Sequence, residues 1–138
     1  MSEKTNKASE MFLGKYNCSQ SVLGAFSEDY GMDLDTAVRI AGGLGSGCRS
    51  AELCGAVSGA VLAVGLKHGD DTAVCISKTE EFLKQFKTRY GDIVCRNLLG
   101  CDITTPDGRE KAVSENLFTT RCLGLVVGAV EILETLGY

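Results

Sequence analysis

Residues 42–69 read GGLGSGCRSAELCGAVSGAVLAVGLKHG, a glycine-rich bend that carries Cys48, followed by an apolar helix. Ser50 is expected to cap this helix, because its hydroxyl can accept a hydrogen bond from a free N–H of the first turn. Cys54 would then lie about one turn inside the helix, where the helix dipole favours a thiolate. The stretch therefore predicts a helix that presents a thiol near its N-terminus.

Small residues recur every four positions along this helix, at Gly55, Gly59 and Ala63. A face without large side chains allows another helix, or a bound group, to come close to the backbone. Glycine inside a helix costs about 1 kcal/mol relative to alanine, so the pattern calls for a reason. We expect close packing beside cysteines, although a tightly packed core helix with apolar cysteines accounts for the same pattern.

The composition indicates one soluble helical domain. The chain has 138 residues, of which 44% are hydrophobic and 23% charged, which is ordinary for a single globular domain. Runs of β-branched and aromatic residues with a period of two are scarce, which favours helices over strands. We therefore expect an all-α fold, a compact bundle of about five to seven helices over residues 1–138, with residues 1–7 frayed.

Charge and hydropathy limit the classes of partner and the location that we expect. The net charge of −4 argues against a nucleic-acid binder, which normally carries a basic face. The polar N-terminus lacks the apolar segment of a secretory signal, and the longest apolar run, residues 53–66, is too short to span a bilayer. A cytoplasmic location is the expectation that follows.

Capping residues and glycines predict where the other helices begin and end. Asn17 can cap a helix that starts at Cys18, which places a second thiol at a helix N-terminus. The further expected helices cover residues 8–14, a segment after Asp33 or Asp35, a long helix from Asp70 or Asp71 through Tyr90, a helix from Thr105-Pro106 to about Asn116, and a last helix from about Leu117 to Leu136.

Seven cysteines are the most informative feature of the composition. In a reducing compartment they indicate metal ligands, catalytic thiols or core residues rather than a disulfide framework. The spacing C-x5-C occurs twice, at Cys48 and Cys54 and at Cys95 and Cys101, each time with arginine after the first cysteine. Six residues along a continuous helix place two side chains on different faces, so each pair can converge only across a bend.

Cys75 and His68 are interpreted as structural residues. Cys75 lies on the expected long helix, away from the other cysteines, and is interpreted as a core residue. His68 is the only histidine and lies near a helix C-terminus, where it can bond the last carbonyls. A hydrolase triad is not indicated, because no serine nucleophile motif accompanies this histidine.

Four segments together resemble the redox-active family named after its cysteine pattern, C_GCAxxG_C_C. They run in order from about residue 11 to residue 134. The matching segments are YNCSQSVLGAF around Cys18, CGAVSGAVLAVGLKHG from Cys54, CRNLLGCDI with TPDGR from Cys95 to Arg109, and RCLGLVVGAVEIL around Cys122.

The resemblance implies an all-helical domain with a redox role carried by cysteines. Its defining cysteines correspond to Cys18, Cys54, Cys95 and Cys122, the candidate redox thiols, while Cys48 and Cys101 are possible partners. The local order here is Cys54-Gly55-Ala56, so either Cys48 or Cys54 can carry the role of the cysteine in the name.

Three hypotheses follow for the cysteines. The first is a thiol/disulfide or electron-transfer centre, in which Cys18 and Cys54 attack or resolve and an unknown redox partner supplies electrons. The second is an iron–sulfur cluster or another soft metal held by Cys18, Cys54, Cys95 and Cys122. The third is a structural or partner-binding domain, with a homodimer formed through the Gly/Ala helix faces.

Overall fold

The computed structural model describes all residues, 1–138, and is built from helices alone apart from one isolated bridge between Leu53 and Val94. The α-helices are α1 (Glu3–Leu13), α2 (Cys18–Phe26), α3 (Leu34–Ile40), α4 (Gly55–His68), α5 (Thr72–Tyr90), α6 (Cys95–Leu99), α7 (Pro106–Ser114) and α8 (Leu123–Thr135). The 3-10 helix η1 (Ser27–Tyr30) and two π-helical turns, η2 (Gly47–Ala51) and η3 (Phe118–Cys122), lie between them.

The predicted all-α fold is confirmed, but the eight α-helices exceed the expected five to seven. Short breaks divide the chain more often than the apolar pattern indicates. Gly100, for example, ends α6 after five residues in a left-handed conformation (φ 73°) that glycine adopts at little cost.

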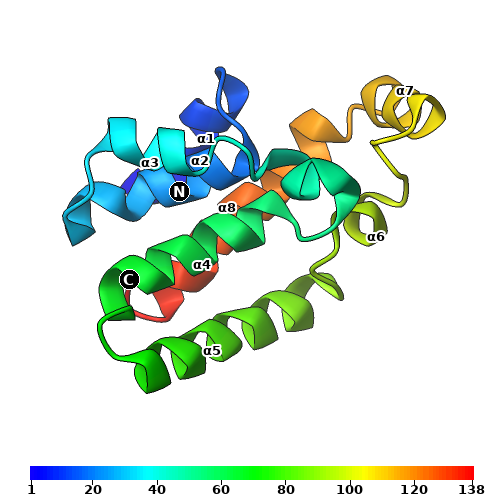
Figure 1. Ribbon diagram of the computed structural model, residues 1–138. Coiled ribbons are helices and arrows are strands. Elements are labelled where there is room, and N and C mark those ends of the chain that lie inside the picture. Colours follow the sequence, from blue (N-terminus) through cyan, green and yellow to red (C-terminus); the bar gives the residue numbers. More distant parts are fainter.

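Helix α4 lies at the centre of the arrangement, in contact with α2, α5 and α8 (Figure 1). The main core gathers apolar side chains from these helices and from α1, with Phe26, Phe82 and Phe86 fully buried. Helices α6 and α7 lie at the end of the molecule where α4 begins (Figure 1). There a second, smaller core forms around Leu99, Ile103 and other residues.

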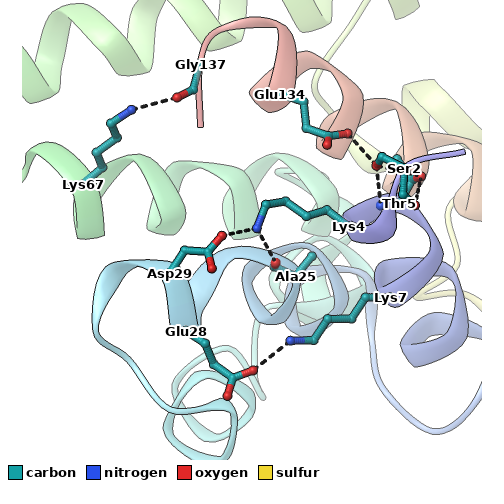
Figure 2. Close-up of polar contacts among 10 residues, drawn as sticks. All are labelled: Ser2, Lys4, Thr5, Lys7, Ala25, Glu28, Asp29, Lys67, Glu134 and Gly137. Atoms are coloured by element: carbon teal, nitrogen blue, oxygen red, sulfur yellow. Dashed lines mark hydrogen bonds and ion pairs between the residues drawn. The ribbon is translucent and has the colours of Figure 1, made fainter.

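The first residues of the chain form the N-cap and first turns of α1, within the segment 1–7 for which the sequence predicts fraying. Ser2 caps α1 by accepting a hydrogen bond from the Thr5 N–H at 3.0 Å, and its hydroxyl donates to Glu134 of α8 at 2.8 Å (Figure 2). Thr5 is buried, and Lys7 pairs with Glu28 at 2.9 Å (Figure 2). Contacts to both α8 and η1 therefore hold the first turn, which the polar sequence does not reveal.

Several predicted helix boundaries are confirmed. Asn17, Asp33, Asp71 and Thr105 each accept an N–H of the first turn of their helix. The predicted start of α4 is wrong: the helix begins at Gly55, Cys54 is its N-cap residue, and Ser50 belongs to η2. The chain at η2 turns in a left-handed sense, which prevents a helix from starting at Ser50.

No single helix is both long and apolar enough to cross a membrane; only α7 and the segment Phe118–Thr135 meet that criterion jointly, as a pair bent by 70°.

The small residues of α4 allow α2 to approach closely. A Cβ atom at Gly59 would lie 2.5 Å from the Ser19 carbonyl oxygen, and one at Gly55 would lie 3.0 Å from Cys18 Sγ. Ser58 also meets Ser19 across this contact, with hydroxyl oxygens 3.4 Å apart. The predicted close packing beside a cysteine is therefore present within the chain, while a homodimer stays a prediction.

Substituting Gly59→Ala tests this contact. The added methyl group meets backbone rather than a flexible side chain, so we expect the free energy of unfolding to fall by about 1–3 kcal/mol in urea denaturation. The matched control is Gly65→Ala on the same helix, where a Cβ meets nothing within 4 Å. That variant should gain up to about 1 kcal/mol from helix propensity, and equal effects of both variants would contradict the packing argument.

Candidate redox site

The four cysteines predicted as redox thiols line one cavity of about 200 Å³. Cys18 begins α2, Cys54 precedes α4, Cys95 begins α6 and Cys122 ends η3. Most of the remaining lining is apolar. The other lining residues are Phe12, Asn17, Ser46, Gly47, Gly55, Ala56, Leu99, Ile103, Arg109, Phe118 and Leu125. The fold thus brings together side chains that lie more than a hundred residues apart in the sequence.

Cys18 is held in place by the capping arrangement of α2. Asn17 Oδ1 accepts the Gln20 N–H at 2.8 Å, and Gln20 Oε1 accepts the Asn17 N–H at 2.8 Å. The side-chain amide groups of Asn17 and Gln20 also donate to backbone carbonyls at or just after the end of α3. Asn17 donates to the Gly42 carbonyl at 3.2 Å, and Gln20 donates to the Val38 carbonyl at 2.7 Å. These bonds fix the first turn of α2, and so Cys18, against the glycine-rich bend.

Cys54 and Cys95 are placed side by side by a two-stranded contact. The Cys54 N–H donates to the Ile93 carbonyl at 2.8 Å, and the Cys95 N–H donates to the Glu52 carbonyl at 2.5 Å. Arg96 reinforces the contact through an ion pair with Glu52, with nitrogen and oxygen 2.5 Å apart. The segments that carry one cysteine of each C-x5-C pair are therefore joined by backbone hydrogen bonds.

Cys122 reaches the cavity through a π-helical turn rather than a regular helix. The neighbouring Arg121 donates its Nε–H to the Leu98 carbonyl at 3.1 Å, which ties η3 to α6. Leu98 is buried in the main core. The turn is thereby anchored at the point where its last residue, Cys122, lines the cavity.

Burial disfavours the ionised form of all four thiols. It raises the pKa of Cys54 to about 12 and that of Cys95 to about 11, and it also raises the pKa of Cys18 and Cys122. After burial, a negative charge on Cys18 is the next cause that raises the pKa of each of the other three. Cys18 is therefore electrostatically coupled to every other cavity thiol.

The prediction that helix N-termini favour thiolates at Cys18 and Cys54 is wrong in its net result. Backbone N–H groups of Ser46 and Ser19 do lower the pKa of Cys18, and those of α4 lower the pKa of Cys54. Loss of hydration in an apolar cavity outweighs these donors, because a thiolate loses more from leaving water than it gains from a few amides.

The bend before Cys54 is a left-handed turn. Ser46, Gly47, Cys48 and Arg49 have φ between 54° and 63° in succession, and Ala51 has φ 54°. Such values are unfavourable for residues other than glycine, and they occur most often at functional sites. The turn presents the Ser46 N–H to Cys18, an interaction that the glycine-rich sequence alone does not indicate.

The remaining cysteines and the histidine lie outside the cavity lining. Cys48 is exposed on the left-handed turn and does not line the cavity that Cys54 lines. Cys101 is half-buried beside the second core, where its charge raises the pKa of Cys95. Cys75 packs against the main core from α5 as predicted, and His68 meets the Tyr138 ring edge-on, with centroids 5.7 Å apart.

The cavity thiols have the chemistry of a soft-metal site, since thiolates bind zinc, copper(I) and iron–sulfur clusters. However, no three His, Cys, Asp or Glu side chains of the chain are grouped closely enough to hold one metal ion. The residues as arranged therefore do not fit a site for a single metal ion, and ligation of an iron–sulfur cluster stays a prediction.

These features define the class of protein as an all-α domain with a thiol-lined cavity. The family described as "Putative redox-active protein (C_GCAxxG_C_C)" matches residues 16–136, and the chain belongs to it. No curated protein and no solved structure is significantly similar to the chain.

The family name contains Gly-Cys-Ala with a glycine three residues after the alanine. This chain has Cys54, Gly55, Ala56 and Gly59, so cysteine and glycine are exchanged relative to the name. A Cβ atom at position 55 would lie 3.3 Å from Cys18 Cβ, close to the span of about 3.5–4.5 Å found in disulfides. A cysteine in the order of the family name would thus face Cys18 directly.

Restoring that order with Cys54→Gly/Gly55→Cys tests the geometry. The new thiol at position 55 crowds Cys18 when both are reduced, and a disulfide removes the crowding. We expect oxidation to raise the melting temperature of this variant by several degrees, on the order of the effect of a disulfide. Cys54→Gly/Gly55→Ala is the matched control, because it adds the Cβ without a thiol and should show no such rise.

The raised pKa values predict slow alkylation of the cavity thiols. In the reduced protein, iodoacetamide at about pH 7.5 should modify exposed Cys48 first, because only the thiolate reacts and access is needed. Modification of Cys54 and Cys95 should accelerate about tenfold per pH unit toward their pKa values of about 12 and 11. Peptide mass spectrometry measures each site; equal rates for Cys48 and Cys54 at the lower pH would contradict their assigned environments.

Proposed function

We propose that the protein carries out thiol–disulfide exchange at the cavity, with Cys18 as the central thiol. The observation that carries the proposal is the convergence of Cys18, Cys54, Cys95 and Cys122 on one cavity. Membership of a family described as redox-active supports the same conclusion at a coarser level.

Cys18 and Cys54 are proposed as the exchanging pair. Backbone N–H groups at the two helix starts lower the pKa of both thiols, which offsets part of the effect of burial. The close approach of α2 to α4 at Gly55 holds Cys18 against the residue that follows Cys54. Cys95 and Cys122 are then alternative partners, since each is electrostatically coupled to Cys18.

The reaction conserves electrons between the protein and its partner. The thiolate of one cysteine attacks a substrate disulfide, which forms a mixed disulfide and releases one substrate thiol after protonation. The second cysteine then attacks the protein sulfur of the mixed disulfide, which releases the second substrate thiol. Two protein thiols are oxidised to a disulfide, and one substrate disulfide is reduced to two thiols.

The environment of the site accommodates both redox forms. A disulfide carries no charge, and neither does a protonated thiol, so an apolar cavity imposes no charge penalty on either form. The thiolate that attacks during exchange is the form that burial disfavours.

Disulfide mapping after equilibration in glutathione redox buffers tests this proposal. We expect two cavity thiols to be lost together on oxidation, with Cys18 in the linked peptide, and we expect Cys18→Ser to abolish that loss. Cys75→Ser is the matched control, because Cys75 lies on α5 outside the cavity lining. The Cys75→Ser variant should lose the same two cavity thiols as the unmodified protein at the same ratio of reduced to oxidised glutathione.

This titration and the iron and sulfide content of an anaerobic preparation separate the other hypotheses. If the cavity cysteines stay reduced under all conditions, they are packing residues and the proposal is overturned. If an anaerobic preparation contains iron and sulfide in equal amounts, a cluster protein is indicated instead.

A further inference from the structure

Arg109 of α7 is the one charged side chain that lines the cavity, and it is exposed at the surface. It comes from the segment TPDGR, to which the sequence alone assigns no chemistry. Its guanidinium lies over the Phe118 ring, 5.5 Å from the centroid, and Phe118 lines the same cavity. The cation is therefore held at the rim of a chamber whose other lining groups are apolar or neutral.

Arg109 differs from the other arginines around the site in having no polar partner. Arg49 donates to Ser46 Oγ at 3.2 Å, Arg96 pairs with Glu52, and Arg121 donates to the Leu98 carbonyl. No hydrogen bond or ion pair engages the guanidinium group of Arg109, so its five N–H donors are available to a ligand. An aromatic ring holds a guanidinium in place without occupying its N–H groups.

We propose that Arg109 binds the anionic group of a small disulfide substrate, so that its sulfur atoms lie in the cavity beside Cys18; this inference rests on the proposed function. A carboxylate is the matching group, because the guanidinium can bind both carboxylate oxygens at once. The substrate class is thus a carboxylate-bearing, low-molecular-weight disulfide.

The size and charge of the site support this class. A volume of about 200 Å³ is below the range of about 300–1,000 Å³ typical of drug-sized ligands, which favours a short substrate arm. The apolar lining offers little to an anion away from the rim. The net charge of −4 repels anions from the surface in general, so a local cation is needed to attract one.

The exchange is balanced with this substrate. The two protein thiols become a disulfide, the S–S bond of the substrate breaks, and two carboxylate-bearing thiols leave with the two protons. Arg109 takes no part in the electron transfer and acts as a specificity-determining residue.

Three small disulfides of different charge test the inference on the full chain. They are dithiodiglycolate, a dianion; bis(2-hydroxyethyl) disulfide, which is neutral; and cystamine, a dication. For Arg109→Gln we expect the second-order rate of thiol loss to fall about tenfold with the dianion, to stay within about twofold with the neutral probe, and to rise with the dication. Raising the salt concentration should shrink the first and third effects.

Two further variants serve as controls. Lys111→Gln removes the same charge from the same helix at a position outside the cavity lining, and it should leave all three rates near those of the unmodified protein. Arg109→Lys should retain part of the preference for the dianion, because it keeps the charge.

The outcomes separate this inference from the proposed function. If Arg109→Gln changes the three rates equally, or not at all, Arg109 does not select anions, although the exchange reaction itself stands. If the unmodified protein reacts with none of the three probes, the proposed exchange function fails.

Discussion

The contact between α2 and α4 is the constraint on which the site depends. At Gly55 and Gly59 the α2 backbone and Cys18 come so near that a Cβ atom would overlap with them. Because no large side chains separate the helices here, α2 and α4 both begin at the same cavity. Cys18 and Cys54 are consequently brought to one cavity by backbone packing, and the second core contributes Cys95 and Cys122 to the same cavity.

The balance between burial and helix electrostatics gives the thiols their character. Amide donors at the start of a helix stabilise a thiolate, which is the property that a helix N-terminus suggests. In this chain the same helix starts are enclosed by apolar side chains, and the pKa of every cavity thiol rises. The cavity cysteines are thus neutral thiols at neutral pH. They can react only where a substrate or reagent reaches the cavity.

The two short polypeptide contacts around the cavity perform different tasks. The bridge between residues 52–54 and residues 93–95 links the two halves of the chain by backbone hydrogen bonds, which do not depend on the side chains present. The left-handed turn at residues 46–49 presents an amide to Cys18 and exposes Cys48 to solvent. Both contacts are made by backbone groups, so the glycine-rich bend and the C-x5-C spacing mark the segments but not the partners that they contact.

The sequence by itself determined the helical class, most capping residues and the identity of the four cavity cysteines. The capping residues can be predicted because a side-chain oxygen before a helix accepts an N–H within three residues of it. The cysteines can be predicted because the family pattern marks them. The tertiary structure alone decided that Cys54 and Cys95 line one cavity and Cys48 does not, that burial overrides the helix dipole, and that Arg109 reaches the rim. Each of these depends on which distant segments exclude water from a group, and desolvation is a property of the packed chain that neighbours in sequence do not set.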